Sequence, residues 1–122
     1  MKAGNVIIDS SVWIDHLRKP NGVVRQLLEE GKALSHSWII GELATGQIKN
    51  RHNFLGNLKL LTMVKEATVK ETLDFLEAHQ LYGRGLSFTD VHVVASALLS
   101  DVRILTRDKP MIVITKEFGI DA

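Results

Sequence analysis

The sequence predicts an α/β domain with a mainly parallel central sheet and helices on both of its faces. Two observations support this class. Short β-branched, apolar stretches such as residues 5–9 and 102–106 have the composition of strands that are buried on both faces. These stretches alternate along the chain with segments of helical period. Ligands of such sheets bind at the carboxyl ends of the strands, so we expect functional side chains at that edge.

The first predicted strand, at residues 5–9, ends in a carboxylate and leads directly into a helix. Ser10-Ser11 opens the first helical turn, and Pro20-Asn21-Gly22 ends that helix. An amphipathic helix follows at 23–30 and stops at Gly31, a residue that tolerates the left-handed backbone found after helices.

The second strand is predicted at 32–35, and two helices follow it. Ser37 is placed to cap a helix over residues 38–48. The polar run 49–53 breaks the helical pattern before a further helix through 54–61.

A brief extended piece near residues 63–64 precedes the next helix. Thr68 is placed to cap that helix, whose apolar positions include Val69, Leu73 and Leu76. Gly83-Arg84-Gly85 ends it.

Residues 87–99 predict a helix that is apolar on almost all sides and is therefore interior. Ser87 or Thr89 would be its N-cap, and Asp90 lies on one side with buried aliphatic residues. A buried carboxylate is costly without a positive partner, so Asp90 should meet an Arg, a Lys, the helix N-terminus or a metal ion. The simpler interpretation is a first-turn acid that the helix dipole favours.

The last strand is predicted at 102–106, and residues 108–110 form a turn after it. Residues 111–118 are ambiguous, because their β-branched composition favours a strand while their place after a strand and a turn favours a helix. We expect a helix there.

Composition limits the function classes. The 122 residues suffice for a single domain over residues 1–122. No stretch approaches the roughly 18 apolar residues that span a bilayer, and the N-terminus lacks a signal-peptide pattern, so we expect a cytoplasmic protein. The absence of cysteine excludes disulfides, thiolate catalysis and cysteine zinc sites. A net charge of +1 does not by itself indicate a nucleic-acid partner.

Four acidic residues fall at the expected edge of the sheet: Asp9, Glu42, Asp90 and Asp108. Each has a simple structural interpretation as a cap, a turn residue or a solvated helix residue. Together, four like charges at one edge would repel unless cations neutralise them. Oxygen ligands without cysteine suit Mg²⁺ or Mn²⁺, which would support metal-assisted phosphodiester hydrolysis. The five histidines show no zinc-site spacing, and His92 is expected at a packing or surface position.

Basic residues near these acids could hold a phosphate backbone, although a solvated surface role is the simpler interpretation for each of them. They are Lys49, Arg51, Arg84, Arg107 and Lys109.

Four segments together resemble the PIN domain family. Ile7-Ile8-Asp9-Ser10-Ser11-Val12-Trp13-Ile14-Asp15 is similar to its opening, and Ile40-Gly41-Glu42-Leu43 to its second acidic motif. Residues 86–97 resemble the third motif, and Leu105-Thr106-Arg107-Asp108-Lys109 resembles the fourth. The order, the spacing and the chain length are similar to those of the VapC-like toxins of bacterial toxin–antitoxin pairs.

This resemblance implies a PIN-like three-layer α/β/α fold with a short, mainly parallel sheet. It implies an Mg²⁺- or Mn²⁺-dependent endoribonuclease that acts on structured RNA such as tRNA or rRNA, and a homodimer that a VapB-type antitoxin inhibits. By position, Asp9 and Asp90 would be the principal metal ligands, Asp108 and Glu42 would complete the acidic pocket, and Ser10 and Thr106 would support it. The β-branched segment 111–115 departs from the helix usual in the family.

Two other interpretations remain open from the residues. A catalytically silent domain of this fold would bind RNA or protein and keep the acids for structure, so it would bind RNA without turnover. A phosphorylatable receiver-like switch would place two acids after the first strand and a Lys after a later one. The single Asp9 and the position of Glu42 on a helix argue against the switch.

Overall fold

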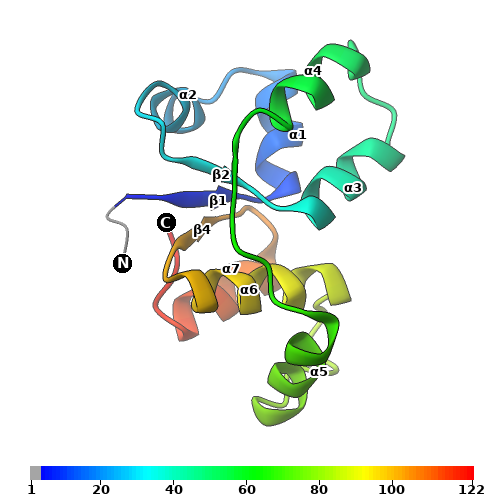
Figure 1. Ribbon diagram of the computed structural model, residues 1–122, viewed down its shortest axis with the longest axis vertical. Helices are drawn as coiled ribbons and strands as arrows, with labels where there is room; N and C mark the ends of the chain where they lie inside the picture. Colours follow the sequence, from blue (N-terminus) through cyan, green and yellow to red (C-terminus); the bar gives the residue numbers. More distant parts are fainter. Residues whose placement is uncertain (1–3) are drawn as a thin grey trace.

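The computed structural model describes residues 4–122, which form a parallel sheet between two layers of helices (Figure 1). The sheet has four strands in the order β3-β2-β1-β4, and all three pairings are parallel. The strands are β1 (Val6–Ile8), β2 (Ala33–Ser35), β3 (Thr62–Met63) and β4 (Arg103–Leu105). The predicted fold class is therefore confirmed.

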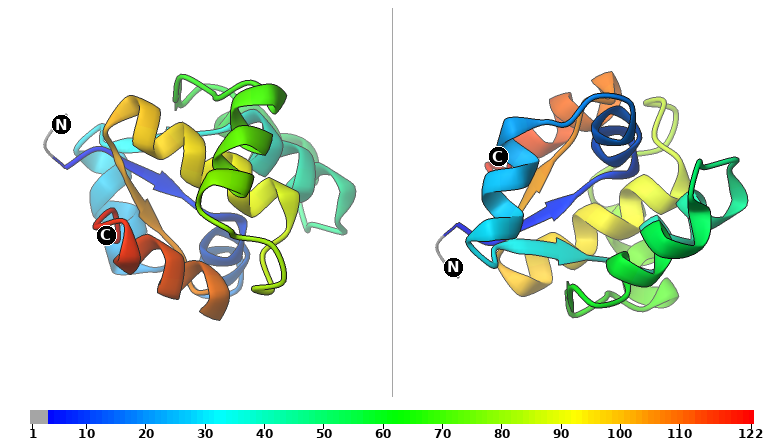
Figure 2. Two further views of the ribbon diagram at one scale, coloured as in Figure 1. Left: turned by 90° about the horizontal axis from the view of Figure 1, so that it is seen from below. Right: turned by 90° about the horizontal axis from the view of Figure 1, so that it is seen from above.

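Helices cover both faces of the sheet. Helices α1 (Ser10–Arg18), α2 (Gly22–Glu29) and α4 (Arg51–Leu58) lie on one side, and α6 (Phe88–Ser100) and α7 (Lys109–Glu117) lie on the other (Figure 1). Figure 2 shows the same two layers from below and from above. Helix α5 (Val69–Ala78) packs on α6, and α3 (Ser37–Thr45) follows β2 and contacts α1, α4 and α6.

The core lies where α6 crosses β1. Ile7 and Ile8 have no exposed surface, and α6 is buried continuously from Val91 to Ala97. A strand covered on both faces needs apolar side chains on both, which explains the unbroken apolar run of β1. No helix within residues 4–122 has the length and the apolar character needed to cross a bilayer.

Several helix boundaries follow from their caps as predicted. Thr68 and Glu71 form a capping box at the start of α5, and Ser87 caps α6. The ambiguous segment after β4 is a helix because the Asp108 side chain caps it and Pro110 lies in its first turn, where a missing N–H is tolerated.

Helix α3 differs from the prediction at both ends. Its N-cap is His36, whose Nδ1 accepts a hydrogen bond from the Trp38 N–H at 3.1 Å, so the assignment of Ser37 as the cap is wrong. The helix ends at Thr45 instead of residue 48, because the backbone of Gly46 is extended.

Three further local predictions are wrong. Helix α4 already begins at Arg51, inside the predicted polar break, after Asn50 adopts a left-handed conformation. Helix α5 ends at Ala78, before the predicted stop at Gly83-Arg84-Gly85. Its apolar residues Val69 and Leu73 are 51% and 49% exposed, because the buried side of this helix is centred on Thr72.

Candidate active site

Asp9 lies directly after β1, at the carboxyl edge of the sheet, and its side chain is held by two hydroxyl groups. It is 5% exposed, and its Oδ2 accepts hydrogen bonds from Ser11 Oγ at 2.9 Å and from Thr106 Oγ1 at 2.8 Å. Thr106 directly follows β4, the strand that pairs with β1. The pairing of these strands thus fixes both the carboxylate and one of its donors.

Asp90 occupies the first turn of α6 and takes part in a capping box. Its Oδ2 accepts from the Ser87 N–H at 2.9 Å, and Ser87 Oγ accepts from the Asp90 N–H at 3.1 Å. The simple interpretation of Asp90 as a first-turn acid is therefore correct, but this bond uses one carboxylate oxygen. Partial burial raises the pKa of Asp90, the Ser87 hydrogen bonds oppose this rise, and the charges of Asp9 and Asp108 add to it.

Glu42 projects from the second turn of α3 toward α1. Its Oε1 accepts a hydrogen bond from Ser10 Oγ at 3.1 Å. Partial burial of the carboxyl group raises the pKa of Glu42, the Ser10 hydrogen bond opposes this, and the negative charges of Asp9 and Asp90 raise it further. The pKa of Glu42 is thus raised in part by the charges of two acids that are 33 and 48 residues away in the sequence.

Asp108 is exposed and caps α7. Its Oδ2 accepts from the Met111 N–H at 3.3 Å, and its own N–H donates to Thr106 Oγ1 at 3.1 Å. Thr106 therefore contacts two of the four acids. Asp108 is thus a helix cap and not the turn residue that the sequence predicts, because residues 109–110 already belong to α7. Its charge also acts on Asp90.

The four acids form one region of uncompensated negative charge. Among residues 4–122, no Arg or Lys forms an ion pair with any of them; the ion pairs there join Lys32 to Glu30, Lys70 to Asp74, Arg84 to Glu117 and Arg107 to Asp15. Adjacent carboxylates without basic partners suit a hard divalent cation, which takes oxygen ligands. The group is open, since no three of its carboxylates bring ligand atoms within 4.8 Å of one another.

The five predicted phosphate-binding residues fall into two groups. Three have partners within the chain: Arg107 pairs with Asp15 at 2.8 Å, Arg84 with Glu117 at 2.7 Å, and Arg51 donates to the Ala44 carbonyl. Lys49 and Lys109 are exposed, and Lys109 directly follows Asp108. The substrate-binding role of all five stays a prediction.

Ser11 is a supporting residue that the sequence did not single out. Its hydroxyl donates to Asp9, and it accepts from the Arg107 N–H at 3.1 Å, so it links the start of α1 to the segment after β4. The signal available was a second hydroxyl two residues after the strand-end acid, a spacing at which Ser side chains bond to nearby groups.

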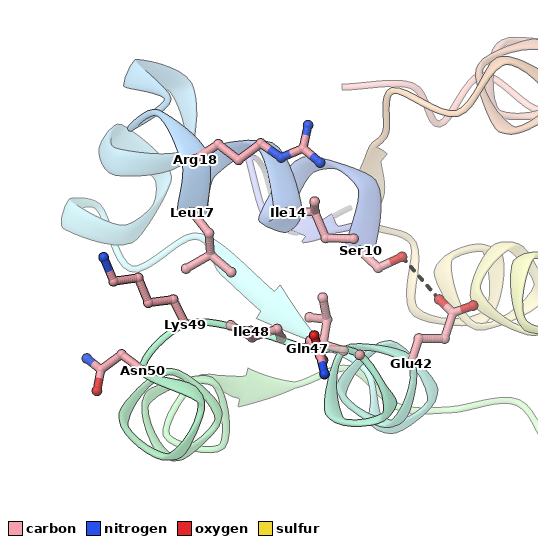
Figure 3. A pocket seen from close by; sticks show the side chains of 11 residues that line it. Ser10, Ile14, Leu17, Arg18, Glu42, Gln47, Ile48, Lys49 and Asn50 are labelled. Carbon is pink, nitrogen blue, oxygen red and sulfur yellow. Dashed lines mark hydrogen bonds between the residues drawn. The ribbon is translucent and has the colours of Figure 1, made fainter.

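An apolar pocket of about 730 Å³ begins beside Glu42 and runs between α1 and the segment after α3. In Figure 3, Ser10 and Glu42 stand at one end of this pocket, and Leu17 and Lys49 lie toward the other. Its apolar lining includes Ile14 and Leu17, which are 43% and 41% exposed. Exposed aliphatic side chains around a hollow mark a surface suited to a partner.

A second polar group lies in the core between α3 and α6. His36 and His92 are 0% and 2% exposed, and a ligand atom from each lies within 4.8 Å of a Glu66 oxygen. His92 is thus a packed residue, one of the two positions expected for it.

Comparison with known proteins identifies the family. A model of the PIN domain matches residues 6–116. The Ribonuclease VapC32 proteins of Mycobacterium tuberculosis strains CDC 1551 / Oshkosh and ATCC 25618 / H37Rv are each 36% identical over 116 residues, 94% of either chain. The crystal structure of PAE2754 from Pyrobaculum aerophilum superposes with a TM-score of 0.68 over 94% of this chain and 87% of that one, at 16% identity. The chain therefore belongs to the PIN domain family and is a homologue of VapC ribonucleases.

Proposed function

We propose that this protein is an Mg²⁺- or Mn²⁺-dependent endoribonuclease, the toxin of a VapBC-type pair, which cleaves structured RNA such as tRNA or rRNA. The observation that carries the proposal is the group of four acids at the carboxyl edge of the sheet, none of them ion-paired with Arg or Lys within residues 4–122. The 36% identity to Ribonuclease VapC32 supports the same activity.

In this proposal the four acids bind the cation, and the residues around them orient their carboxylates. Asp9 and Asp90 are the main ligands, and Glu42 and Asp108 complete the set. Ser11, Thr106 and Ser87 orient the Asp9 and Asp90 carboxylates through the hydrogen bonds described above. A bound divalent cation would supply an activated water and stabilise the leaving oxygen of the phosphodiester.

In this proposal, exposed basic residues next to the four acids and at the apolar pocket bind the substrate. Lys109, next to Asp108, and Lys49, at the apolar pocket, have ammonium groups available for phosphate oxygens. Phosphate contacts of this kind position a nucleic acid without reading its sequence.

Cleavage of total RNA tests the proposal. Wild type with Mg²⁺ is expected to cut discrete sites, and both EDTA and Asp90→Asn are expected to abolish cutting. Asp74→Asn is the matched control, because Asp74 is an exposed acid on α5 that pairs with Lys70, away from the site. Bound but uncut RNA at every Mg²⁺ and Mn²⁺ concentration would favour the catalytically silent binding domain instead.

The proposed partner is a VapB-type antitoxin, and the proposed state is a cytoplasmic homodimer. The apolar pocket that ends at Glu42 would accept an antitoxin segment with aliphatic side chains and a basic residue near the acids. Co-expression with the protein encoded directly upstream should yield a complex that does not cleave RNA. Leu17→Glu should release this inhibition while the free enzyme keeps its activity. Unchanged inhibition in this variant would contradict binding of the antitoxin in the apolar pocket.

A further inference from the structure

The polar group between α3 and α6 is a closed hydrogen-bond network. His36 Nε2 lies 3.0 Å from His92 Nδ1 and 3.0 Å from Ser96 Oγ. Ser96 Oγ also donates to the His92 carbonyl at 2.7 Å and accepts from the Ala67 N–H at 3.0 Å. Buried polar groups are tolerated when each finds a partner, and such networks fix one arrangement of the elements that carry them.

Two contacts determine where the His36 proton lies. Its Nδ1 accepts from the Trp38 N–H, so the proton of the neutral ring must be on Nε2. The hydroxyl proton of Ser96 is donated to the His92 carbonyl, so Ser96 Oγ must accept from His36. Both constraints make His36 Nε2 a donor. In this tautomer the Nε2 lone pair is not available to a metal, so we interpret the group as a hydrogen-bonded joint between the two helices and not as a cation site, although Glu66 is near.

The joint connects the two helices that carry Glu42 and Asp90. His36 is the N-cap of α3, six residues before Glu42, and His92 follows Asp90 by two residues on α6. The Trp38 ring stacks on His92 with centroids 4.4 Å apart and an interplanar angle of 10°, which adds a second contact between the same helices. Glu66 fixes the α3 start from a third segment by accepting from Ser37 N and Ser37 Oγ.

A small rotation of α3 about this joint would displace Glu42 relative to Asp90. Six residues of helix span about 9 Å, so a tilt of about 10° at the N-cap would move Glu42 by about 1.5 Å. Mg²⁺ requires near-ideal octahedral geometry with ligands at about 2.0–2.1 Å, so a displacement of that size would remove a ligand.

We propose that His36, with His92 and Ser96, is a positioning residue that sets the separation of Glu42 and Asp90 and thereby the affinity of the site for its divalent cation. This inference rests on the proposed function, since it concerns the same acids. Burial lowers the pKa of His36 to about 4, so the ring is in its neutral, network-forming state at neutral pH.

Mn²⁺ titration of three variants tests the inference. His36→Asn keeps an N-cap acceptor for Trp38 but is too short to reach α6, and it should weaken Mn²⁺ binding about tenfold, the lower range for residues that support metal ligands. His36→Gln places an amide N–H near the position of Nε2 and should restore most of the affinity. Ser96→Ala keeps both rings and should weaken binding in the same direction. The Mg²⁺ concentration for half-maximal RNA cleavage should rise in parallel, with kcat at saturating Mg²⁺ near that of wild type.

Val24→Ala is the control for a purely structural effect. Val24 is a fully buried residue of α2, which packs on β2 and lies on the sheet face opposite α6 (Figure 1), so its truncation lowers stability away from the contact between His36 and His92. Its folded form should bind Mn²⁺ as wild type does. Two outcomes would overturn the inference. One is a Mn²⁺ affinity within twofold of wild type in folded His36→Asn and Ser96→Ala. The other is Zn²⁺ binding that survives in the double variant Asp9→Asn/Asp90→Asn and is lost in His36→Gln. Failure of wild type to bind Mn²⁺ or cut RNA would instead contradict the proposed function.

Discussion

The Thr106→Val substitution tests which contacts stabilise the acidic site, because the Thr106 hydroxyl group forms hydrogen bonds with two of the four acidic residues. Thr106 Oγ1 donates to Asp9 Oδ2 at 2.8 Å and accepts from the Asp108 N–H at 3.1 Å. Valine has nearly the same shape as threonine but can neither donate nor accept these hydrogen bonds. Asp9 is 5% exposed, so water cannot readily replace the lost donor, and Ser11 remains as its other hydroxyl partner.

The expected loss is about 2 kcal/mol of unfolding free energy without metal, within the range of about 1.5–3 kcal/mol for a hydrogen bond to a charged group. The unfolding entropy of 122 residues is about 0.26 kcal/mol/K, so the melting temperature should fall by about 8 °C. The Asp9 carboxylate is also less well oriented in the variant, so Mn²⁺ affinity should fall about tenfold.

Urea and thermal unfolding in EDTA measure the loss, with Thr106→Ser as the matched control that keeps the hydroxyl. A double-mutant cycle with Ser11→Ala should show coupling, because both hydroxyls donate to the same oxygen, Asp9 Oδ2. A Thr106→Val protein that melts within about 2 °C of Thr106→Ser, by the same entropy conversion, would refute the view that this hydroxyl holds a buried carboxylate.

Three further predictions concern charge, capping and surface pairing. The pKa values of Glu42 and Asp90 are raised in the folded protein by burial and by the neighbouring acids, so their ionisation opposes folding. Buried His36, whose pKa is lowered, acts in the opposite direction over the same pH range, so the test is the difference between proteins. In urea titrations without metal, wild type should gain stability relative to Glu42→Gln or Asp90→Asn as pH falls from 7 through the raised pKa values. An unchanged pH slope in both variants would contradict this. Thr68→Ala removes the capping box of α5 and should cost about 1 kcal/mol in urea unfolding, with no change in Mn²⁺ affinity. Arg107→Gln breaks an exposed pair with Asp15 and should change stability by less than about 1 kcal/mol, so a larger loss would show that the pair is structural.

The sequence predicted the features that depend on local patterns. An unbroken β-branched run predicted β1, and the stretch 102–106, with β-branched residues at alternate positions, predicted β4. The position of Thr68 predicted the start of α5. The placement of the four acids also followed from such patterns, because strand ends and helix starts share one edge of a parallel sheet.

The features that the sequence did not predict depend on contacts between distant segments. His36 replaces Ser37 as the cap of α3 because its ring also reaches His92, 56 residues away, and no local spacing signals that contact. The buried side of α5 is centred on Thr72, because its hydroxyl is satisfied by the Thr68 carbonyl and the residue can then pack against α6. Val69 and Leu73 remain partly exposed for the same reason.

Mn²⁺ binding to wild type and to Asp9→Asn, measured by electron paramagnetic resonance, tests most directly whether the four acids hold a divalent cation. Asparagine keeps the shape of Asp9 and can still accept from Ser11 and Thr106, so the fold should persist while a charged ligand is lost. We expect wild type to bind Mn²⁺ and Asp9→Asn to bind it at least about tenfold more weakly, with loss of RNA cleavage. Equal Mn²⁺ affinity in the two proteins would contradict the assignment of these acids as the metal site.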